Sequence, residues 1–245
     1  MNVFAFHIQT AKRLSPLMDG ATIRDIDTST SLLLKVPMAV QTYYETICQI
    51  EPFARRNFIV EEICLMKRPY SKEKHDFVVA KVKHLRGHDI SDQLEYLVIE
   101  KSPSSSTASS SSVTSHIVSQ CRRADGDRDG QLKGYLTFNT SSNSNNKKLC
   151  LLEELFRLIA IISENSHLYS TNIDAPFWFA ATIMETAQAI FPCDEDESGW
   201  FKRTFLGSKP QSECGRQIIV AYKADIKKNP IPTPQLEERV SCQIQ

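Results

Sequence analysis

Apolar residues in alternating or nearly continuous runs mark three neighbouring segments in the first half of the chain as strands. Residues 58–68, 76–85 and 94–101 are rich in β-branched and aromatic side chains. The polar connection RGHDISDQ at 86–93 joins the last two segments. This arrangement predicts a long antiparallel hairpin.

Two further strands are predicted after a serine-rich stretch. Residues 102–115, SPSSSTASSSSVTS, are too polar to form a packed core and predict a disordered insertion. Short apolar runs at 116–123 and 132–138 are typical of strands, and NTSSNSNNKK at 139–148 predicts a flexible link. Phosphorylation of the insertion is a regulatory alternative to a simple spacer.

A helical repeat precedes the strands. Apolar residues recur on one stripe through 38–51, which predicts a helix. Pro37 suits the first position of this helix, because the N–H that proline lacks would be unpaired there. Pro52 predicts that the helix ends or bends near residue 51.

The second half of the chain is predicted to be helical. Apolar residues fall at helical spacing in 150–165, and their density in 176–191 predicts a largely buried helix. Asp174 stands where it would cap the second of these helices. Residues 214–228 fit a final helix, and the proline-containing residues 229–245 are predicted to form an extended or disordered tail.

The order of these elements predicts the fold class. Strands gather early and helices late, so we expect an α+β fold in which an antiparallel sheet packs against helices. A single domain over residues 1–228 accounts for most of the 245 residues.

Composition narrows the classes of function. The 29 basic residues balance 29 acidic ones, so nucleic acid is not an expected partner. We expect no transmembrane segment, since no apolar run approaches the roughly 18 residues that a spanning helix needs. The start, MNVFAFHIQTAKRL, does not have the pattern of a secretion signal. A cytoplasmic location is predicted, with a nuclear one as the alternative, and a protein partner stays open.

The cysteines and glycines predict neither a metal nor a cofactor. The seven cysteines include no C-x-x-C pair, so reduced and mostly buried thiols are expected. His84 and His88 are four residues apart, but they lie in or near the predicted hairpin connection and lack the glutamate of the H-E-x-x-H motif, so a zinc enzyme has little support. The glycine patterns of nucleotide-binding and hydrolase loops are also missing.

The segment DGDRDG at 125–130 begins like a calcium-binding loop. Its aspartates and Gly130 match the first positions of such a loop, but the twelfth position, which needs a glutamate, is Leu136. An exposed hairpin turn is therefore the preferred interpretation.

Three short segments carry a resemblance to a known class of protein. They are RPYSKEKHDFVVAKV, which contains His75, then YLVIEK at 96–101, and HLYSTNIDAPFWFA, which leads into the helix at 176–191. Together they resemble fungal proteins with circularly permuted papain-like domains of the NlpC/P60 and lecithin:retinol acyltransferase-like class. The resemblance spans roughly residues 58–191.

This resemblance implies a cysteine-based mechanism, and it also implies that the nucleophilic cysteine is missing from this chain. In the class, a histidine on a strand activates a cysteine at a helix N-terminus. His75 occupies the histidine position here, although without the resemblance a solvated edge residue is the preferred interpretation of a histidine directly before a strand. The cysteine position falls on Pro176, or on Ile173 if the alignment shifts, and neither side chain is a nucleophile. Cys64, on the strand before His75, is the alternative nucleophile.

Three hypotheses of function follow. The first is a catalytically inactive papain-like fold, a pseudoenzyme that acts as a binding or interaction module. The second is a thiol hydrolase or acyltransferase that uses His75 with Cys64. The third is an unrelated α+β binding protein. The distance from the His75 ring to the nearest cysteine sulfur would separate the first two hypotheses.

Overall fold

The computed structural model describes residues 37–68, 76–85, 94–101, 116–121, 130–138, 149–165, 175–195 and 213–231. By its contacts the chain divides into two units, Met1–Leu32 and Leu33–Gln245. The first unit lies outside the described residues, so every described helix and strand belongs to the second unit.

One antiparallel sheet runs through the described residues. Its seven strands lie in the order β1-β5-β4-β3-β2-β6-β7. They are β1 (Met38–Ala39), β2 (Phe58–Lys67), β3 (Asp76–His84), β4 (Leu94–Lys101), β5 (His116–Cys121), β6 (Gln131–Phe138) and β7 (Cys193–Glu195). The five predicted strands are β2 to β6, and the predicted hairpin is the antiparallel pair of β3 and β4.

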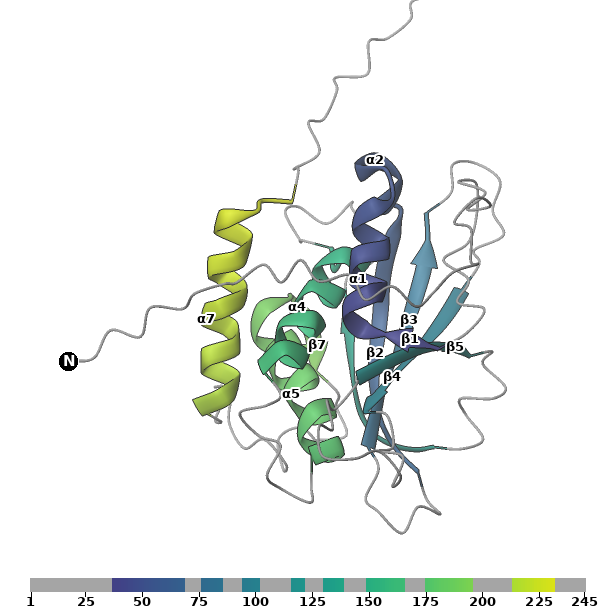
Figure 1. Ribbon diagram of the computed structural model, residues 1–245. Coiled ribbons are helices and arrows are strands. Elements are labelled where there is room, and N and C mark those ends of the chain that lie inside the picture. The colour runs from purple at the N-terminus through teal and green to yellow at the C-terminus, as the bar shows by residue number, and fades with distance from the viewer. Residues whose placement is uncertain are drawn as a thin grey trace, which may run out of the picture. The chain divides into compact units, whose positions relative to one another are not determined.

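Helices cover one face of this sheet. They are α1 (Val40–Gln49), α2 (Pro52–Arg55), α4 (Leu152–Glu164), α5 (Ala175–Ile190) and α7 (Glu213–Lys228). Of these, α1, α4 and α5 pack against strands, while α7 packs outside them against α4 and α5 (Figure 1). The predicted α+β class is therefore confirmed.

The core lies between the sheet and these helices. Residues that face each other across neighbouring antiparallel strands point to the same side of a sheet. A row of such residues is fully buried: Leu65, Val78, Ile99 and Val118. We call the side of the sheet that this row shares the helix face.

The opposite side of the sheet carries a smaller apolar cluster. Met66, Phe77 and Val98 are buried there, and Cys64 and Val79 pack against them. Each of these residues neighbours a helix-face residue along its own strand, so its side chain points the other way.

Some details of the prediction are wrong. Pro37 does not open the first helix, because Met38 and Ala39 pair with β5 and α1 begins only at Val40. The short strand β7 was not expected, and neither was β1. Strands of two or three residues leave no detectable period in a sequence, so only their pairing reveals them.

Several predicted segments lie outside the described residues. These are the insertion at 102–115, the link at 139–148 and the tail beyond residue 231. The domain boundary at residue 228 stays a prediction.

Candidate functional site

The start of α5 is where the resemblance places a nucleophile. The helix begins at Ala175, and Pro176 is its second residue. Its first four residues are Ala-Pro-Phe-Trp, which include neither a thiol nor a hydroxyl. The helix predicted over 176–191 is thus confirmed, and its beginning supplies no nucleophile.

A histidine does contact this end of α5, but it is not the predicted one. His116, the first residue of β5, stacks on Phe179 with ring centroids 3.7 Å apart and an angle of 19° between the planes. Its Nδ1 atom lies 2.8 Å from the hydroxyl of Ser163 in the last turn of α4. His116 therefore connects β5, α4 and α5. We call His116, Ser163 and Phe179 together the His116 contact.

Burial determines the charge of His116. The side chain is buried, and desolvation followed by the charge of Lys101 lowers the pKa of His116 to about 4. The imidazole is therefore neutral at pH 7. Ser163 lies near the negative end of the α4 dipole, which disfavours an alkoxide. The pair is thus poorly suited to activate a serine nucleophile.

The strand register sets further polar residues beside His116 on the helix face. Lys101 pairs directly with His116, and Lys67 pairs with Asp76. The register of β3 with β4, continued by two residues, puts Asp76 level with Lys101. We call Lys67, Asp76, Lys101 and His116 the polar row.

Asp76 is the buried anion of the polar row. Its side chain has no exposed area, and Oδ2 accepts an ion-paired hydrogen bond from Lys133. Its Oδ1 atom is buried without a hydrogen-bond partner. An unsatisfied buried oxygen of this kind costs about 1–3 kcal/mol, which makes Asp76 a candidate for a role other than stability.

Cys64 lies away from the polar row and from α5. Its side chain is on the sheet side opposite the helix face, opposite Val79 in the register. Its Sγ atom donates to Glu62 Oε1 at 2.7 Å. Activated thiols occur in electropositive surroundings. The negative carboxylate of Glu62 disfavours a thiolate at Cys64 instead.

The other sequence-predicted residues can be placed only in part. His75 lies outside the described residues, so its distance to Cys64 is not measured. In the calcium-like segment the three aspartates lie outside as well, but Leu136 is fully buried in β6. In the parts of the chain that the structure describes, no three acidic, histidine or cysteine side chains gather as a metal site would need.

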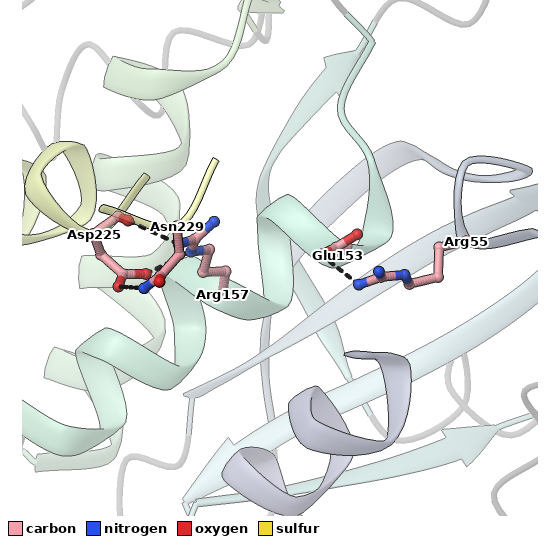
Figure 2. A network of polar contacts seen from close by, with 5 residues as sticks. All are labelled: Arg55, Glu153, Arg157, Asp225 and Asn229. Carbon is pink, nitrogen blue, oxygen red and sulfur yellow. Dashed lines mark hydrogen bonds and ion pairs between the residues drawn. The ribbon is translucent and has the colours of Figure 1, made fainter. Parts of the chain in front are cut away.

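A second polar network centres on α4 (Figure 2). Arg55 of α2 donates to Glu153 Oε1 at 2.7 Å. Arg157 donates from Nε to Asp225 Oδ2 at 2.5 Å and from Nη2 to the Asp225 carbonyl at 2.9 Å. Asn229 donates to Asp225 Oδ1 at 3.0 Å. These bonds tie α2 and α7 to α4, which is a structural role.

Comparison with known proteins adds nothing to these observations. No protein-family model, curated protein or solved structure matches the chain. None of the helices in the described ranges is long and apolar enough to cross a membrane.

Sequence reasoning missed His116 as a site residue. It begins a predicted strand, and His75 directly precedes one, but no local pattern distinguishes a histidine that contacts a helix from one that contacts solvent. The one signal in the sequence was the position of His116 directly after the serine-rich insertion. Its pairing with Lys101 is known only from the structure.

Proposed function

We propose that this chain is a non-catalytic papain-like domain that acts as a binding module. The observation that carries the proposal is the His116 contact at the start of α5. There the imidazole is buried, neutral at pH 7 and 2.8 Å from a serine hydroxyl. A thiol enzyme needs a base that is poised to take a proton from a cysteine, and this histidine contacts no cysteine among the residues that the structure describes.

The position of Cys64 supports the same proposal. A nucleophile benefits from the positive end of a helix dipole and from a nearby histidine. Cys64 lies on the sheet side opposite the helix face and donates to the carboxylate of Glu62. Binding without turnover is then the role that best fits the described geometry.

The proposal is tested by treating the pure protein with a chloroacetamide probe and, separately, with a fluorophosphonate probe. We expect labelling no faster than that of an unstructured cysteine peptide or serine peptide. Cys48, which is exposed, serves as the internal reference for an accessible thiol outside the candidate site. Mass spectrometry of the digested protein identifies each labelled residue.

Three variants sharpen this experiment. Cys64→Ser, His75→Ala and His116→Gln should all leave the labelling rates within about twofold of the parent. Fast labelling of Cys64 that disappears in His75→Ala would refute the proposal and support the thiol hydrolase. Fast fluorophosphonate labelling of Ser163 that disappears in His116→Gln would refute it in favour of a serine enzyme.

A further inference from the structure

His116 holds together three elements that are distant in the sequence. Its ring covers Phe179 of α5, its Nδ1 atom meets Ser163 of α4, and its backbone belongs to β5. Ser163 and Phe179 flank the connection from α4 to α5. Any change in the state of this imidazole therefore acts directly on the way the start of α5 is held against the sheet.

Among the described residues, none that contacts His116 carries a negative charge that would compensate a positive charge on its ring. From β4 comes Lys101, from α4 the hydroxyl of Ser163, and from α5 the ring of Phe179. Among the described residues of β1 and α1, which also pack on β5, no charged side chain acts on the ring. The end of the α4 dipole favours a cation by about 0.3–1 kcal/mol, which is small against burial of the charge.

The neighbouring charges of the polar row are also mostly positive. Lys67 and Lys101 belong to the row, and Lys133 is ion-paired with Asp76. Asp76, the one carboxylate of the row, is about two strand spacings from His116, roughly 10 Å. An imidazolium at residue 116 would add a buried cation to a lysine-rich end of the sheet.

We propose that the His116 contact is an acid-sensitive switch: it holds the start of α5 against β5 when the imidazole is neutral, and it opens when the imidazole is protonated. The proposal does not depend on whether the domain has any catalytic activity. It concerns a local movement of α5 that precedes acid unfolding of the whole sheet.

The direction of the effect follows from proton linkage. The folded pKa of His116 is lowered to about 4, whereas an exposed histidine has a pKa of about 6.5. The open form therefore binds the proton more tightly between these values. The contact is fully stable above about pH 6.5 and weakens as the pH falls toward 4. Its opening equilibrium should rise on the order of a hundredfold across this window.

Trp178 offers a direct measurement, because it precedes Phe179 in α5. The chain has two tryptophans, so replacing Trp200 with phenylalanine leaves Trp178 as the sole reporter. We expect a reversible change in its emission between pH 6.5 and pH 4. Hydrogen exchange, corrected for the intrinsic effect of pH, should show lost protection in 175–180 and 116–121 before it is lost in β2 and β3.

Variants at two histidines make the test specific. His116→Gln keeps a polar side chain near Ser163 without titrating, so the emission change should disappear. His84→Gln is the matched control, because His84 also stacks on an aromatic ring, that of Phe58. His84 ends β3, whereas Asp76 of the polar row begins it, so the control lies far from the His116 contact. This control should titrate like the parent.

A second substitution covers the case in which glutamine disturbs packing. His116→Phe keeps a ring against Phe179 and should also abolish the emission change. Persistence of the parental titration in a folded His116→Gln or His116→Phe variant would overturn the proposal. So would a parent whose Trp178 emission and α5 protection stay constant until the whole sheet unfolds.

Discussion

At the scale of single residues, the polar row is held at a cost in stability. Asp76 is buried with one oxygen unsatisfied, and His116 is buried as a neutral base beside Lys101. Apolar residues of similar size would pack in the same places without these penalties. Polar residues retained at such sites are candidates for function, and Asp76 and His116 lie at the same end of the sheet.

The ion pair of Asp76 and Lys133 allows this cost to be measured. Lys133→Met leaves a buried carboxylate without its partner and should destabilise the fold by about 3–5 kcal/mol. The double variant Asp76→Leu with Lys133→Met removes both charges and should recover most of that loss. Urea unfolding followed by circular dichroism measures the differences.

Lys83→Met is the control for these variants. Lys83 lies 4.0 Å from Glu61 in a partly exposed pair, so its replacement should cost less than about 1 kcal/mol. If the double variant were as unstable as Lys133→Met alone, the pair would be needed for stability, and the case for a functional polar row would weaken.

At the scale of elements, α4 is the central helix, against which the other helices pack or with which they form ion pairs. It contacts β2, α1, α5 and α7, and its buried charges reach α2 and α7 through ion pairs (Figure 2). The outer helix α7 buries only Cys214, Gly215, Ile218 and Tyr222. With so narrow an apolar stripe, the bonds from Arg157 to Asp225 should contribute substantially to its docking.

The dependence of α7 on this ion pair is testable. The side chain of Arg157 is only 4% exposed, so Asp225→Ala would leave a buried guanidinium poorly compensated. We expect a loss of about 3 kcal/mol, as for a buried pair that loses one partner, and faster hydrogen exchange in α7 than in β2 to β4. Glu213→Ala removes an exposed ion pair with Arg216 and an exposed hydrogen bond from Gln217, so its stability and its exchange in α7 should stay close to those of the parent.

At the scale of the whole molecule, the sheet organises segments that are far apart in the sequence. The serine-rich residues 102–115 separate β4 from β5, but Lys101 and His116 pair directly across the two strands. The two ends of the insertion are therefore neighbours. The fold needs only a short turn between them, whatever the insertion does.

Replacing residues 102–115 with a four-residue glycine-containing turn tests this conclusion. The shorter connection loses less entropy on closure, so the fold should become more stable by about 1 kcal/mol. A loss of more than about 2 kcal/mol in urea unfolding would show that the insertion contributes contacts to the folded domain. A scrambled insertion of the same composition is the matched control and should behave like the parent.

Much of the fold was predictable because its causes are local. Strands β2, β3 and β4 are long enough to show their composition and period, and the polar segment between β3 and β4 signals a turn. Helices α4 and α5 were predictable for the same reason, because the spacing and density of their apolar residues are typical of buried helices. The candidate site was less predictable: the sequence pointed to the start of α5 but did not single out His116, and the predicted His75 lies outside the described residues.

The sequence by itself determined the type and order of the main elements and the lack of a thiol or hydroxyl in the first four residues of α5, since these depend on residues close together in the chain. Only the tertiary structure decided that Cys64 points away from α5 and that His116 meets Ser163 and Phe179. The physical reason is strand register, because a shift of one residue moves a side chain to the other side of the sheet. That register is set by pairing between distant segments, which no local pattern reports.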